Sequence, residues 1–229
     1  MSTVGLADRL EAPPKETGPL WHWQYPSVPE ALADILLLLK GLFAANDPRL
    51  WDHSVRVGKV SRATAELLEL PMAQTDRLEA AGYLHCIGLL GRLSPGVTCV
   101  GATSPAEEIH DAVDQCQSGV QILSEVPRLV DLGPVILLSR RRWDEEGLPS
   151  GPQGDAIPVE AGVLSVIDAF DRAVHGLDGK RVRVSDALDR IRKGGGTLFD
   201  PKVVGAFMDA CESTLTARDL WGTPRLDFE

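Results

Sequence analysis

The chain has 229 residues, with 23 lysines and arginines against 33 aspartates and glutamates, so its formal net charge is −10. Hydrophobic residues make up 44% and charged residues 24% of the sequence, which is the composition of a globular protein and not of a disordered one. The acidic balance argues against nucleic acid or an anionic membrane surface as a partner, because both are bound through extended basic surfaces.

The sequence also lacks the signals of a membrane or secreted protein. Its longest aliphatic run, residues 35–39, is far shorter than the roughly 20 residues that a membrane helix needs. The N-terminus does not have the basic-then-apolar order of a signal peptide. The four cysteines show no CxxC spacing, so we expect reduced thiols and a cytoplasmic location.

The first 27 residues contain four prolines together with Trp21 and Trp23, which predicts an irregular N-terminal arm followed by one domain over residues 28–229. We expect the two tryptophans to pack against that domain. From residue 29 apolar residues recur every three or four positions, which predicts an amphipathic helix that ends at Asn46-Asp47-Pro48.

The helical pattern continues along the rest of the chain. A second predicted helix carries His53 and runs to Pro71, and a third carries His85 and runs from Thr75 to near Gly91. Residues 93–104 and 145–154 are rich in turn-forming residues and are predicted loops. Further helices are predicted over residues 105–126, 128–143, 158–175, 184–193 and 201–216. Because no segment shows a sustained two-residue alternation, the predicted fold is an all-α helical bundle.

Three side chains with metal-ligand chemistry lie on predicted helix faces that also carry apolar residues. They are His53, His85 and Asp168. A single histidine on such a face is most often a hydrogen-bonded core residue. Two histidines and an aspartate together are also typical of a metal site, and their spacing alone leaves both interpretations open.

Six short motifs in one order then suggest a family. They are Asp47-Pro48 followed by His53-Ser-Val-Arg-Val57, Leu78-Glu-Ala-Ala-Gly-Tyr-Leu-His-Cys-Ile-Gly88, Gly119-Val-Gln-Ile-Leu123, Arg142-Trp-Asp-Glu-Glu-Gly-Leu-Pro149, Val166-Ile-Asp-Ala-Phe-Asp171 and Phe199-Asp-Pro201. Over about residues 30–210 this series resembles the HD-GYP domain, a group of HD phosphohydrolases that hydrolyse cyclic di-GMP at a centre of two or three metal ions. The resemblance implies an HD-domain-like helical bundle and a role in bacterial signalling.

Against that resemblance, four positions at which the family carries metal ligands hold other residues. They are Cys86, Gln115, Ser139 and Arg140, so that only His53, His85 and Asp168 remain of the implied set. Two divalent ions need a bridging carboxylate and several ligands each. We therefore predict that the chain has no catalytic residues and holds no metal or other cofactor. A weaker alternative is one divalent ion at His53, His85 and Asp168, to which Cys86 would add a thiolate. The simplest interpretation of Cys86 is an inert, small buried residue.

Three functions follow from these departures. The leading hypothesis is a catalytically inactive HD-GYP-like domain that acts as a regulatory or protein-interaction module, with another signalling protein as its partner and a homodimer as an option. The second is a metal-free receptor that binds a cyclic dinucleotide or another phosphate through Arg140, Arg141 and Arg142. The third is a residual single-metal phosphohydrolase. We expect at least one of Arg140 and Arg141 to point toward Asp168, and a pair between them favours the inactive module.

Overall fold

The computed structural model describes residues 30–92, 105–144, 151–177 and 181–212. These residues form the predicted all-α bundle, and the described part contains no strand beyond one isolated bridge between Gly195 and Phe199. The predicted arm, residues 1–27, and its tryptophans lie outside the described residues. The division into arm and domain therefore stays a prediction.

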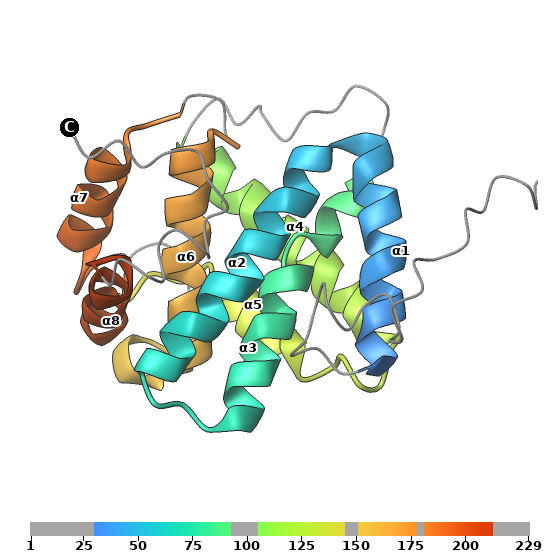
Figure 1. The fold of residues 1–229 in the computed structure, drawn as a ribbon, viewed down its shortest axis with the longest axis horizontal. Coiled ribbons are helices and arrows are strands. Elements are labelled where there is room, and N and C mark those ends of the chain that lie inside the picture. The colour runs from blue at the N-terminus through green and yellow to red at the C-terminus, as the bar shows by residue number, and fades with distance from the viewer. Residues whose placement is uncertain (1–29, 93–104, 145–150, 178–180, 213–229) are drawn as a thin grey trace, which may run out of the picture.

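The described residues form eight α-helices, which make up the bundle shown in Figure 1. In chain order they are α1 (Glu30–Asn46), α2 (Pro48–Leu67), α3 (Met72–Leu84), α4 (Pro105–Ser124), α5 (Leu132–Leu138), α6 (Val159–His175), α7 (Val184–Gly194) and α8 (Pro201–Glu212). Two short 3₁₀ helices, η2 (Ile87–Arg92) and η3 (Gly154–Ala156), lie between them. Figure 1 shows α2 between α1 on one side and α6, α7 and α8 on the other.

Helix α2 is the central element, and its sequence explains where it begins and what it buries. The Asp47 side chain caps it by accepting a hydrogen bond of 3.0 Å from the backbone N–H of Arg49, and Pro48 occupies the first turn, where its missing N–H costs nothing. Val57 and Val60 are buried on the same face as His53. This face packs against α3 and α6, so that His53 lies in the interior of the bundle.

The crossing of α2 and α3 is a close backbone contact. A Cβ atom added at Gly82 would lie 2.6 Å from the Cα atom of Gly58, which is closer than any real Cβ contact. The two glycines therefore let the helix axes approach closely. This approach fixes the last turn of α3, after which His85 and Cys86 follow, relative to α2.

Two of the predicted helices are shorter than the periodicity indicated. The third predicted helix ends at Leu84, and η2 follows it, because Gly88 lies so close to α4 that an added Cβ would meet the backbone oxygen of Gln115 at 1.9 Å. The helix predicted over 128–143 spans only Leu132–Leu138. Pro134 fits its first turn, where no N–H is needed. After the helix ends, the backbone N–H groups of Trp143 and Asp144 donate hydrogen bonds to Leu198 and Thr197, so these residues do not continue the helix. None of the described helices has the length and apolar character needed to cross a membrane.

Candidate metal centre

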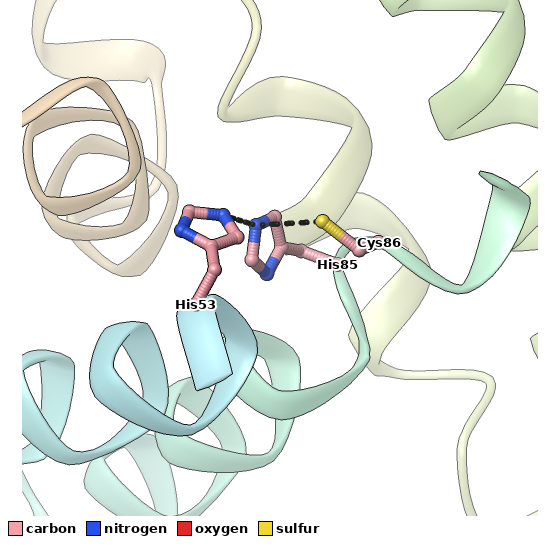
Figure 2. A group of neighbouring side chains, drawn as sticks. All are labelled: His53, His85 and Cys86. Carbon is pink, nitrogen blue, oxygen red and sulfur yellow. Dashed lines mark hydrogen bonds between the residues drawn. The ribbon is translucent and has the colours of Figure 1, made fainter. Parts of the chain in front are cut away.

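Three segments bring four candidate ligands together in the interior. His53 comes from α2, His85 and Cys86 follow the end of α3, and Asp168 comes from α6. The Nε2 atoms of the two histidines are 3.0 Å apart, and the Sγ atom of Cys86 lies 3.3 Å from Nε2 of His85 (Figure 2). Oδ1 of Asp168 lies 3.0 Å from Nε2 of His53 and 3.2 Å from Nε2 of His85. All four residues are buried.

The other ring nitrogen of each histidine is already used. Nδ1 of His53 donates to Oδ2 of Asp171 over 2.7 Å, and Nδ1 of His85 donates to the backbone oxygen of Gly82 over 2.7 Å. Asp171 is fully buried and also accepts two hydrogen bonds from Arg56, at 2.7 and 2.9 Å. Contacts of this kind fix the ring orientation and tautomer of metal-binding histidines. Both Nε2 lone pairs consequently point into the shared space.

Two lone pairs that face each other at 3.0 Å repel unless a cation lies between them. Burial by itself lowers the pKa of His53, but hydrogen bonds with Asp168 and Asp171 raise that pKa well above its usual 6.5. Burial likewise opposes the charge on His85, and the neighbouring Cys86 and Asp168 raise the pKa of its imidazole to about 9. The centre is therefore built to hold positive charge, either as protons or as a metal ion.

Cys86 is not the inert apolar residue that the sequence predicted. Burial would raise the pKa of its thiol, but the adjacent His85 and His53 lower that pKa to about 5. A thiolate at neutral pH is a nucleophile and a metal ligand. The residue therefore brings a negatively charged sulfur to the histidine pair.

The side chains fit one metal ion. The ligand atoms of His53, His85 and Cys86 all lie within 4.8 Å of one another, and Oδ1 of Asp168 adjoins the same two nitrogens. Nitrogen, sulfur and carboxylate oxygen are the donors that zinc prefers. The prediction that the chain holds no metal is therefore wrong: it gave the lost ligands of a two-metal centre more weight than the alternative of one ion at His53, His85 and Asp168 with a Cys86 thiolate.

Arg140 is the cation on the far side of Asp168. Its Nη1 atom donates to Oδ2 of Asp168 over 2.6 Å, which confirms the expectation that an arginine points toward this carboxylate. Burial raises the pKa of the Asp168 carboxyl, but Arg140 and then His53 more than offset this and hold that pKa well below its usual range. A fixed positive charge in this place repels a second divalent ion.

The remaining predicted residues lie outside the ligand set. Ser139 is buried, and its hydroxyl donates to the Ile136 carbonyl of its own helix over 2.8 Å. Arg142 forms two hydrogen bonds with Asp144, at 2.9 and 2.7 Å. Arg141 lies so close to Gly151 that an added Cβ there would meet its Nη1 at 2.5 Å. Gln115 is buried on α4, and its Nε2 has no hydrogen-bond partner among the described residues. Of the predicted arginine trio, Arg140 contacts the centre, through Asp168.

Sequence reasoning missed Asp171 and Arg56, which hold His53 in place. A usable signal was present, because each lies three residues after a candidate ligand, Asp171 after Asp168 and Arg56 after His53. Residues three apart share a helix face. Two charged residues on apolar faces beside candidate ligands indicate a buried ion pair that supports the site.

Comparisons with known proteins identify the family of the chain. The family model of the HD domain matches residues 38–203. A cyclic di-GMP phosphodiesterase of Thermotoga maritima is 29% identical over 180 residues, which cover 77% of this chain and 49% of the relative. The cyclic di-GMP phosphodiesterase response regulator RpfG of Xanthomonas campestris is 30% identical over 156 residues, which cover 67% of this chain and 41% of the relative.

A solved structure has the same fold. It is a cyclic GMP-AMP specific phosphodiesterase of V. cholerae, with a TM-score of 0.62 at 16% identity over 82% of this chain and 50% of that one. This chain spans about half the length of these relatives. The family match covers most of the chain and agrees with the HD-GYP resemblance of its motifs. The chain belongs to the HD domain family.

Proposed function

We propose that the chain is a regulatory domain of bacterial cyclic dinucleotide signalling that holds one metal ion at His53, His85, Cys86 and Asp168 and does not hydrolyse its ligand. Relatives named as cyclic di-GMP phosphodiesterases support the signalling context and the ligand class. The proposal places the protein in the cytoplasm. In this proposal the chain acts by binding a partner, which is either another signalling protein or a second copy of the chain.

The observation that carries the proposal is the thiol of Cys86 at 3.3 Å from Nε2 of His85. Metal sites that serve structure are closed by four protein ligands, whereas catalytic sites keep one position open for water or substrate. With three ligands the centre would have such an open position, and Cys86 is the fourth. A metal ion held there would cross-link α2, α6 and the segment after α3, and it would stabilise their arrangement.

The lack of a second metal position among the described residues supports the same proposal. Two-metal hydrolysis of a phosphodiester needs a second ion about 3.5–4 Å from the first, to activate water and to stabilise the leaving oxygen. Arg140 donates to the Asp168 oxygen that faces away from the histidines, and its charge occupies that side of the carboxylate. Gln115 and Ser139, at the other substituted positions, offer no charged ligand.

The experiment combines elemental analysis of the purified chain with chromatography of cyclic di-GMP incubated with it. We expect close to one zinc-type ion per chain, a strong loss of that ion in Cys86→Ala, and no more linear product than a protein-free control gives. Two transition metal ions per chain would contradict the proposal. Product that forms in proportion to protein and disappears in His85→Ala would also contradict it.

A one-metal phosphodiesterase is the second candidate, and the guanidinium of Arg140 beside the centre favours it. A positioned arginine can stabilise the charge that develops on a phosphoryl group during hydrolysis. In this case His53, His85 and Asp168 would be the ligands, and the position facing Cys86 would stay open. Cys86→Ala separates the two candidates, because it would retain both metal and turnover in the enzyme but would lose the metal in the regulatory domain.

A further inference from the structure

The buried surroundings of the metal centre carry more positive charge than the protein itself balances once an ion is bound. A divalent ion is neutralised by the Cys86 thiolate and the Asp168 carboxylate, since a coordinating thiol is deprotonated. Asp171 is neutralised by Arg56, with which it forms two hydrogen bonds. Arg140 then remains as one uncompensated cation. Its acid partner is Asp168, and the negative charge of Asp168 is already balanced by the metal ion. This step rests on the proposed function, since it requires the metal ion.

The hydrogen bonds of Arg140 give the same result independently. Its Nη1 donates to Asp168, but its Nε is buried and has no acceptor among the described residues. Cys116 contacts the guanidinium but does not balance its charge, because burial raises the pKa of the Cys116 thiol and disfavours the thiolate. A buried guanidinium N–H without an acceptor is costly, and in native proteins such groups are usually satisfied by a ligand or by water.

A second donor without a partner lies in the neighbouring element. Nε2 of Gln115 on α4 is buried and also lacks an acceptor in the described part of the chain. Gln115 precedes Cys116, which contacts Arg140. The side chain of Arg140 as a whole is 17% exposed, although its Nε is buried. Two donors without acceptors beside an excess positive charge favour the same kind of ligand, an anion.

We propose that Arg140 is the anion-binding residue of the metal-loaded chain and that its ligand is a phosphate oxyanion carrying a single negative charge, such as a phosphodiester. The guanidinium presents Nε and a terminal nitrogen side by side, and this fork matches two oxygens of one phosphoryl group. A phosphodiester monoanion balances the one uncompensated charge, and it would take an acceptor position that no described residue fills.

The test is calorimetric titration of the full zinc-loaded chain with two probes, inorganic phosphate and cyclic di-GMP. We expect cyclic di-GMP to bind with a dissociation constant below about 1 mM. Arg140→Gln should weaken this binding roughly 10- to 100-fold, the effect of a lost charged hydrogen bond. Arg140→Lys keeps the charge but loses the fork, and we expect an intermediate loss. Arg142→Gln is the matched control and should bind like wild type, because Arg142 is already paired with Asp144.

The two probes separate the sources of the anion. Tighter binding of cyclic di-GMP than of inorganic phosphate, with both weakened in Arg140→Gln, identifies a phosphodiester, and the reverse order identifies free phosphate. Binding of neither probe to the zinc-loaded wild type overturns the inference, as does unchanged binding in both Arg140 variants. If Arg140→Gln fails to fold or loses its metal, Arg140→Lys decides the question.

Failure of the proposed function has a different signature. A wild-type chain that holds no metal after exposure to zinc overturns the proposed function. If this metal-free chain binds phosphate and both Arg140 variants lose that binding, Arg140 is still supported as the anion-binding residue. If the metal-free chain binds no phosphate, this inference is overturned as well.

Discussion

His53 is positioned by a chain of hydrogen bonds that begins at the protein surface. Arg56, whose side chain is 18% exposed, donates to Asp171, and Asp171 accepts the Nδ1 proton of His53. Because the carboxylate holds the proton on Nδ1, the Nε2 atom faces the centre, where it binds either a proton or a metal ion. Asp171 therefore governs metal binding without being a ligand itself.

We expect Asp171→Asn to weaken zinc binding by about 10- to 100-fold, which is the typical effect of removing such a supporting carboxylate. The amide cannot act as the charged acceptor of the Nδ1 proton, and it leaves Arg56 without its ion-pair partner. Competition with a chelating dye measures the affinity. Asp186→Asn is the matched control, because Asp186 forms its ion pair with Arg183 at the surface. Equal affinities for the two variants would contradict the role of Asp171.

At the scale of elements, the contact between Gly58 of α2 and Gly82 of α3 sets the position of His85. The helix axes approach so closely there that backbone meets backbone. Any larger side chain at Gly82 must push the helices apart, because backbone atoms cannot rotate away as a flexible side chain can.

We expect Gly82→Ala to lower the free energy of unfolding by about 1–3 kcal/mol, the usual cost of overpacking a core. Gly205→Ala provides the control, because Gly205 is exposed on α8 and an added Cβ there would meet nothing within 4 Å. Alanine in that helix should raise the free energy of unfolding by up to about 1 kcal/mol. Urea denaturation followed by circular dichroism measures both, and a stabilised Gly82→Ala would contradict the close contact.

The periodicity of apolar residues was sufficient to predict the helices and their order. It could not predict where α3 and α5 end, because those ends depend on contacts with distant segments. Gly88 meets the backbone of α4, and Trp143 and Asp144 bind the turn between α7 and α8. Hydrophobic periodicity reports which face of a helix is buried and carries no information about a neighbour's backbone.

For the molecule as a whole, the motifs identified the HD family and the residues His53, His85 and Asp168, which the structure brings together. They could not give the number of metal ions, because that number depends on whether the substituted positions can still complete one set of ligands. Cys86 does so only because the turn after α3 directs its thiol at His85. The direction of a side chain at the end of a helix is a property of the tertiary structure.

The buried charges also make the stability of the whole chain depend on pH in a definite way. The pKa values of Asp168 and Asp171 are lowered from an ordinary 3.8, so their stabilising contribution is present above about pH 4 and is lost as the pH falls further. The pKa values of His53 and His85 are raised, so in the metal-free chain their contribution is complete below 6.5 and is lost toward pH 9. The pKa of Cys86 is lowered from 9.0 to about 5, so its contribution is complete above pH 9, is lost toward pH 5, and offsets part of the loss from the two histidines.

We therefore expect the metal-free chain to be most stable near pH 6.5, where the histidines are still protonated and the Cys86 thiol has lost its proton, and we expect zinc to remove the loss of stability on the alkaline side, because the ion replaces the protons. Urea denaturation across this pH range, with and without zinc, measures the effect. A metal-free chain whose unfolding free energy stays constant from pH 6.5 to 9 would contradict the protonation of the histidine pair.

The opposed Nε2 atoms of His53 and His85, 3.0 Å apart, also restrict the evolutionary routes open to this sequence. Loss of Cys86 first would leave two facing lone pairs without the thiolate charge that helps to attract a cation. Loss of Asp168 first would leave Arg140 buried without its ion-pair partner. Replacing one histidine removes the repulsion itself. A lineage that abandons metal binding would thus have to keep the histidine pair protonated or lose one of the two, and a chain that keeps both still bears the selective constraint of holding a cation.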